Sequence, residues 1–110
     1  MKRTEYINYH TYVLLMEENN GMRYCKVGIT TDIKKRMRNY RLHNPAITAV
    51  LFCENQDLED DILWVFREER IEESEWFCTT LTADEIIDEI NCWGNFKLIA
   101  QTTDYEGKII

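Results

Sequence analysis

Two strand-like segments joined by a tight turn near the start of the chain constrain its fold more than any other feature. Residues 10–16, HTYVLLM, are rich in residue types that favour β-strands, and so are residues 22–29, MRYCKVGI. Between them lies EENNG, in which Gly21 can take the positive φ of a tight turn. The pattern predicts an antiparallel hairpin over residues 10–29, and therefore an antiparallel sheet.

The rest of the chain alternates between helical and extended patterns. Thr31 is a favoured N-cap residue and Asp32 suits a first helical turn, while TADE at residues 82–85 has the pattern of a capping box. The predicted elements are helices near 31–42, 57–71 and 82–92, a third strand near 47–53, a short extended segment at 74–79 and a final candidate strand at 96–102. We expect one α+β domain over residues 1–110.

Charge is distributed unevenly along the chain. The formal net charge is −7, with 20 acidic and 13 basic residues. Residues 23–41 nevertheless carry seven basic residues against one aspartate, a local net charge of +6 that leaves −13 on the remainder. The seven are Arg23, Lys26, Lys34, Lys35, Arg36, Arg38 and Arg41. Such a distribution argues against a protein that coats nucleic acid generally, but it suits phosphate binding at one site.

The four cysteines are widely separated, and no CxxC pair is present. Zinc sites usually contain such pairs, so we expect reduced and mostly buried thiols without zinc or disulfides. The first ten residues lack the apolar core of a secretory signal, and no apolar run reaches the roughly 18 residues of a membrane span. These features predict a cytoplasmic protein with no membrane contact.

An ordered set of short motifs gives the chain a family resemblance. In order stand YVL at 12–14, KVG at 26–28, Arg36, NP at 44–45, Glu59 and EWF at 75–77. This set resembles the GIY-YIG nuclease superfamily, most closely its compact branch in phage proteins and in fungal proteins linked to meiosis. The resemblance covers about residues 11–90. It implies a small three-stranded antiparallel sheet flanked by helices, in the order ββαβα with a C-terminal helix.

The resemblance also implies a small metal-dependent endonuclease or nickase. One divalent ion, Mg²⁺ or Mn²⁺, would be held by a helix glutamate, here Glu59. The arginine that steadies the scissile phosphate corresponds to Arg36, eight residues after Gly28. A strand residue, usually tyrosine, would help to activate the attacking water. Lys26 lies at that strand position. We expect Arg36 to point inward and to open with Glu59 onto one shallow cleft, with Lys26 on the strand beside them.

Each of these residues also has a plainer interpretation. Arg36 could be an ordinary solvated arginine, although its planar fork suits phosphate. Glu59 shares a helical face with apolar residues, where a carboxylate is costly unless it is paired or metal-bound, but it could lie at the rim of the first turn. Lys26 could protect an edge strand. Tyr24 shares the strand face of Lys26 and could supply a catalytic phenol, but it could equally serve packing alone.

Two departures from the family pattern concern the active site. Leu14 stands where the superfamily has its other tyrosine in the first strand. Leu63 stands where the compact branch often has a histidine in a helix. The remaining candidates near the site are Tyr12, Tyr40 and His43, with Lys34, Lys35, Arg38 and Arg41 as nucleic-acid contacts. Glu75, Trp76 and Phe77 are expected to be structural.

Three functions therefore remain open. The first is an endonuclease acting on nucleic acid, with DNA the expected substrate. The second is an inactive relative that binds nucleic acid through the basic segment. The third is a protein-binding module whose acidic surface mimics nucleic acid or engages a basic partner. We expect a monomer or a homodimer.

Overall fold

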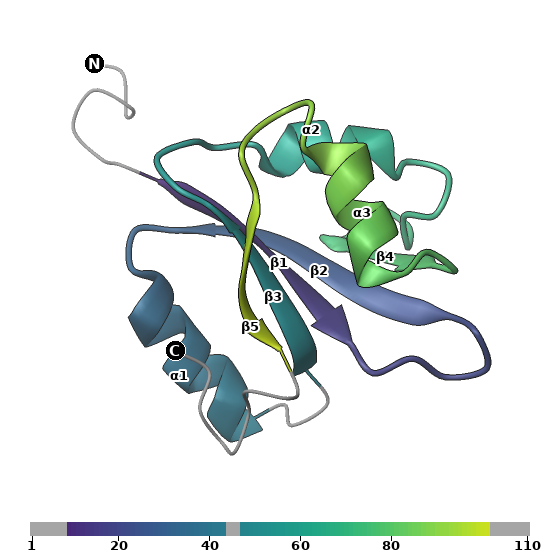
Figure 1. Cartoon of the computed structure of the whole chain (residues 1–110), viewed down its shortest axis with the longest axis horizontal. Helices are drawn as coiled ribbons and strands as arrows, with labels where there is room; N and C mark the ends of the chain where they lie inside the picture. The colour runs from purple at the N-terminus through teal and green to yellow at the C-terminus, as the bar shows by residue number, and fades with distance from the viewer. Residues whose placement is uncertain (1–8, 44–46, 102–110) are drawn as a thin grey trace.

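The computed structural model describes residues 9–43 and 47–101, with the backbone alone at residues 40–43, 100 and 101. One antiparallel sheet of five strands runs through this part of the chain (Figure 1). In spatial order the strands are β4 (Trp76–Thr79), β2 (Arg23–Thr30), β1 (His10–Met16), β3 (Ile47–Cys53) and β5 (Lys97–Gln101). The predicted α+β fold class is confirmed.

The predicted hairpin forms the centre of the sheet. Strands β1 and β2 pair in antiparallel register, with Tyr12 opposite Gly28. The turn is closed by two backbone hydrogen bonds between Asn19 and Met22, and its central residues Asn20 and Gly21 have φ values of 55° and 78°. Positive φ at both central positions matches the twist of the flanking strands, which explains why an Asn-Gly pair connects them.

Three helices flank the sheet, close to the predicted positions. They are α1 (Ile33–His43), α2 (Glu59–Val65) and α3 (Ala83–Ile90). Asp32, and not Thr31, caps α1, because its carboxylate accepts the Lys35 N–H at 3.1 Å. The predicted capping box of α3 is confirmed.

Helix α2 is much shorter than the predicted span of 57–71. After Val65 the chain continues in turns, in which Arg67 N–H donates to the Trp64 carbonyl at 3.2 Å. Further on, the Arg70 guanidinium donates to the Ser74 carbonyl at 2.7 Å, and Glu72 has a φ of 53°. These local turn contacts take the place of further helical hydrogen bonds, although the sequence favours continuation of the helix.

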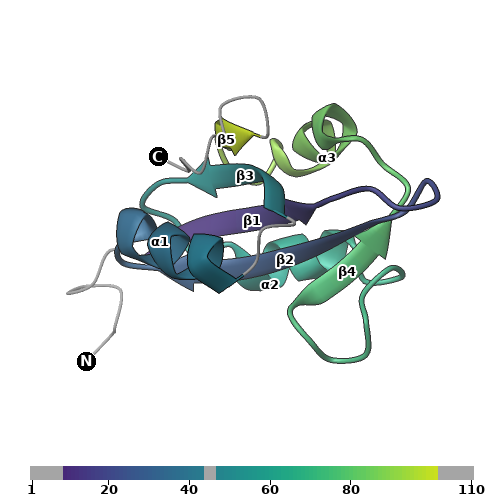
Figure 2. The same cartoon turned by 90° about the horizontal axis from the view of Figure 1, so that it is seen from below.

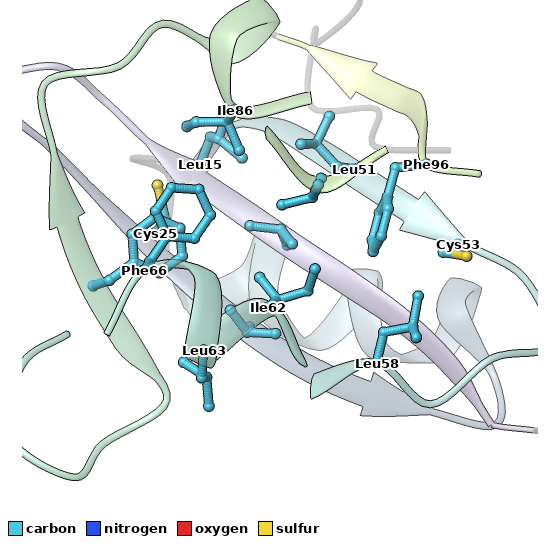
Figure 3. Close-up of a cluster of buried hydrophobic side chains, with 14 of the residues drawn as sticks. Leu15, Cys25, Leu51, Cys53, Leu58, Ile62, Leu63, Phe66, Ile86 and Phe96 are labelled. Carbon is cyan, nitrogen blue, oxygen red and sulfur yellow. The ribbon is translucent and has the colours of Figure 1, made fainter. Parts of the chain in front are cut away.

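The sheet has a hydrophobic core on each face. Helices α2 and α3 cover one face, where Leu15, Leu51 and Ile62 belong to a larger cluster (Figure 3). Helix α1 covers the other face (Figure 2), where Met37 packs in a smaller cluster with Tyr12. The two helices that were expected to carry site residues, α1 and α2, therefore lie on opposite faces of the sheet.

The sheet contains two more strands than the three expected from the family resemblance. β4 pairs with β2, and β5 pairs with β3, so each extends one side of the central three. Both segments had been recognised as extended from the sequence, but their pairing depends on contacts distant along the chain, which local patterns do not encode.

All four cysteines are free thiols, of which Cys25 and Cys53 are buried, Cys78 is half-buried and Cys92 is exposed. Burial raises the pKa of Cys25 to about 12, which keeps this thiol protonated. We expected most of the thiols to be buried, and two of the four are. Among the helices of the described ranges, none combines the length and the apolar character needed to cross a membrane.

Candidate active site

Glu59 is the first residue of α2, and its position is set by the loop before it. The Leu58 N–H donates to Thr11 Oγ1 at 2.7 Å, and Thr11 Oγ1 donates to the Gln56 carbonyl at 2.7 Å. This anchors the start of α2 to β1. No side chain caps the helix, but the three acidic residues of its first turn interact favourably with the helix dipole.

The carboxyl group of Glu59 forms a pair with that of Glu75. The two carboxyl groups lie close enough to interact, and the pKa of Glu59 is raised to about 7. Desolvation by partial burial is the largest cause, followed by the hydrogen bond and the negative charge of Glu75; Asp57 and Asp60 add further repulsion. The pair therefore holds a proton near neutral pH.

Lys26 joins this pair from β2. Its Nζ lies 3.7 Å from Glu75 Oε1, and its side chain is 17% exposed. The ammonium group also lies 5.9 Å from the centroid of the Tyr12 ring, and Tyr12 itself packs directly over Gly28, where a Cβ would collide with its phenol. Lys26, Glu75 and Glu59 thus form a chain of interactions that links β2 to α2, with an ion pair between Lys26 and Glu75 and electrostatic coupling between Glu75 and Glu59.

Arg36 lies apart from this chain of contacts. It is exposed, so the prediction that it points inward is wrong. Its side chain lines a hollow of about 330 Å³ at the start of α1, together with Thr30, Thr31, Asp32, Lys35 and Asn39. This hollow includes no residue of α2, so the structure does not confirm the single cleft expected for Arg36 and Glu59.

The helices that carry Arg36 and Glu59 nevertheless begin at the same end of the hairpin. Helix α1 starts three residues after Thr30, the last residue of β2. Helix α2 starts next to Leu58, which is bonded to Thr11, and Thr11 pairs with Ile29 of β2. Both helix N-termini therefore lie by one end of β2, on opposite faces of the sheet.

The basic segment divides into structural and exposed cations. Arg23 ties β2 to its neighbours, because its Nη1 donates to the Met16 carbonyl at 3.0 Å and to Thr48 Oγ1 at 3.1 Å. Lys34, Lys35 and Arg38 are exposed on α1. The side chains of Tyr40, Arg41 and His43 lie outside the described part of the structure, so their predicted roles remain predictions.

The two departures from the family pattern are both core residues. Leu14 is 1% exposed and belongs to the cluster under α1, whereas Leu63 is 4% exposed and belongs to the cluster under α2 and α3. Tyr24, which shares the strand face of Lys26 as expected, is exposed and lines a different hollow with Trp76.

Glu75 is the residue that sequence reasoning missed. It was interpreted as structural within EWF, but its carboxylate connects Lys26 with Glu59. The pairing of Glu75 with Lys26 becomes apparent only when β2 and β4 are placed in register, with Lys26 opposite Trp76. The identity of the partner therefore depends on a long-range contact.

Metal-binding capacity at this position rests on two carboxylates. Within the described ranges, no group of three or more histidine, cysteine, aspartate or glutamate side chains is arranged to hold a metal ion. Mg²⁺, however, commonly takes one or two carboxylates and completes its coordination with water and phosphate oxygens. Glu59 and Glu75 match that smaller donor set.

Comparison with known proteins identifies a family. No curated protein and no solved structure matches the chain. A family model, described as the T5orf172 domain, matches residues 9–94, a span that contains β1 and β2, all three helices and the Lys26–Glu75–Glu59 contacts. The chain therefore belongs to the T5orf172 domain family.

Proposed function

We propose that this protein is a small metal-dependent endonuclease or nickase of the GIY-YIG type. The T5orf172 family is compatible with a nuclease-like or nucleic-acid-binding role. The observation that carries the proposal is the contact chain from Lys26 through Glu75 to Glu59, located at the end of the sheet where the basic helix α1 begins. A perturbed carboxylate pair beside a lysine is typical of sites that handle charge and protons.

The donor set fits a hard divalent cation, Mg²⁺ or Mn²⁺. Two adjacent carboxyl groups that repel each other bind a proton between them, and a cation would relieve the same repulsion. Glu59 and Glu75 would hold this ion. When bound, it supplies Lewis-acid stabilisation of the negative charge that develops on the phosphate.

The protein's own side chains would bind and orient the substrate. Lys26 would exchange its contact with Glu75 for a phosphate oxygen, or orient the attacking water. Arg36 would clamp a phosphate from the hollow at the start of α1, because a guanidinium binds two phosphate oxygens at once. The exposed cations of α1, Lys34, Lys35 and Arg38, would hold the nucleic-acid backbone.

Nucleic-acid binding without cleavage is the second candidate function. Leu14 and Leu63 are buried hydrophobic residues at positions where the family often has a tyrosine and a histidine. Neither can activate water. If Lys26 does not take over that role, the basic helix would still bind nucleic acid.

A cleavage assay with a matched carboxylate control tests the proposal. Purified protein is incubated with supercoiled DNA and Mn²⁺ or Mg²⁺, beside Glu59→Gln and the control Glu68→Gln, an exposed glutamate just after α2. We expect nicking by the wild type and Glu68→Gln, and a loss of about 100-fold or more in Glu59→Gln with binding retained. Equal cleavage by Glu59→Gln would refute the mechanism. Binding without cleavage by the wild type would establish the second function.

A further inference from the structure

A second hollow lies at the tip of the β1–β2 hairpin, away from α1. Its volume is about 600 Å³, and it is lined by Met16, Glu17, Glu18, Asn19, Tyr24 and Trp76. In Figures 1 and 2 the hairpin turn and helix α1 lie toward opposite ends of the molecule. No residue of α1 lines the hollow, although Met16 and Trp76 pack on the face of the sheet that α1 covers.

The walls of this hollow combine aromatic rings with acidic groups. Tyr24 is 53% exposed, and Trp76 from the adjacent strand β4 is partly exposed. Glu17 and Glu18 are exposed, and neither forms an ion pair with any residue in the described part of the chain. Large exposed aromatic side chains gathered in a hollow are characteristic of a binding surface.

We propose that this hollow binds a lysine or arginine side chain from a basic segment of a partner protein. The faces of tyrosine and tryptophan rings attract cations, and two unpaired carboxylates add electrostatic attraction. The same carboxylates repel phosphate, so a nucleic acid is a poor occupant. The net charge of −7 favours approach by a basic partner.

This surface adds an activity to the proposed function and does not depend on it. The cations of α1 and the acidic-aromatic hollow lie at different ends of the sheet, so one molecule can contact nucleic acid and a basic protein segment simultaneously. The buried residue Met16 forms part of the floor and supplies apolar contact for the methylene stem of a lysine or arginine.

A peptide-binding measurement tests this inference. The probe is a fluorescein-labelled peptide that alternates arginine with glycine, and its control is the same peptide with citrulline, which is neutral, in place of each arginine. Fluorescence polarisation is followed for the wild type, Tyr24→Ser, Glu17→Gln/Glu18→Gln and the charge-matched control Glu72→Gln/Glu73→Gln. The substituted residues are exposed, so we expect every variant to fold as judged by circular dichroism.

We expect the wild type and Glu72→Gln/Glu73→Gln to bind the arginine peptide equally. Glu17→Gln/Glu18→Gln and Tyr24→Ser should each bind it about tenfold more weakly, and the citrulline peptide should bind as weakly as these variants. Equal loss in the two double variants would show a general charge effect and overturn the proposal. Equal binding of the citrulline peptide, or no binding of the arginine peptide, would also overturn it. So would dimerisation of the wild type in sedimentation experiments that Tyr24→Ser abolishes, because a second copy of the chain would then occupy the hollow.

Discussion

At the scale of single residues, the central feature is a carboxyl group that retains its proton near neutral pH. Glu59 owes its pKa of about 7 first to burial and then to Glu75, so the fold places two like charges together. Proteins keep such arrangements at functional sites more often than elsewhere. The arrangement has a thermodynamic consequence that can be measured without any knowledge of the substrate.

The stability of the fold should fall as pH rises through the pKa of Glu59. Because the folded pKa of Glu59 is raised above its ordinary value of 4.5, the native state binds more protons than the unfolded state between that value and about 7. The stabilisation is complete below the unfolded pKa and is lost as the pH passes the folded pKa. Urea denaturation at about pH 5 and about pH 8 should show this loss in the wild type.

Glu59→Gln should remove most of this pH dependence, because an amide cannot ionise. The variant should therefore be more stable than the wild type at about pH 8 and similar at about pH 5. Glu68→Gln, whose carboxylate is exposed, should retain the wild-type profile. Parallel profiles for the wild type and Glu59→Gln would show that Glu59 does not carry the proton.

At the scale of elements, local sequence rules explain the parts of the fold that depend on neighbouring residues. The Asn-Gly turn between β1 and β2 and the Thr82–Glu85 capping box could be predicted because each is determined within a few residues. The early end of α2 could not be predicted in this way. It coincides with the hydrogen bond from Arg70 to the Ser74 carbonyl and with the stacking of the Phe66 ring on the Phe77 ring, whose centroids lie 4.1 Å apart.

The same distinction applies to the candidate site. Lys26 and Glu59 could be identified from the motif order, whereas Glu75 required the register between β2 and β4. The inward orientation expected for Arg36 was wrong because α1 presents Met37 to the sheet, and the preceding position faces solvent. Helical spacing alone does not determine the direction of a residue that lies next to a buried one.

The capping box of α3 gives a prediction for this helix. Thr82→Ala removes the side chain that accepts the Glu85 N–H at 3.2 Å, while the bond from the Thr82 N–H to Glu85 at 2.9 Å can remain. We expect a loss of about 1 kcal/mol in the free energy of unfolding. Chemical denaturation measures this free energy. The control is Thr80→Ala, because Thr80 is exposed in the connection between β4 and α3. No difference between the two variants would contradict the capping assignment.

At the scale of the whole molecule, charge is separated between surfaces. Lys34, Lys35 and Arg38 are exposed on α1, while the chain outside residues 23–41 carries a net charge of −13. A molecule with this distribution binds a polyanion in one orientation, because its other surfaces repel it. Arg23, which is hydrogen-bonded within the sheet, and Lys26, which is paired with Glu75, do not add to this basic surface.

The salt dependence of nucleic-acid binding should report the cations of α1. Replacing Lys34, Lys35 and Arg38 together with glutamine should weaken binding and reduce the slope of log K against log salt by about 1 for each lost phosphate contact. Arg67→Gln, which removes an exposed cation stacked 3.9 Å from the Trp64 ring, should leave the slope unchanged. An unchanged slope in the triple variant would place the phosphate contacts elsewhere.

The measurement that tests the central claim most directly is a double-mutant cycle on the Mn²⁺-dependent rate of DNA nicking, using Glu59→Gln, Glu75→Gln and the double variant. Because the two carboxylates are proposed to act as one unit, each single change should cost about 100-fold or more, and the double change should cost little beyond either. Wild-type activity in Glu75→Gln, or losses that multiply in the double variant, would contradict the account.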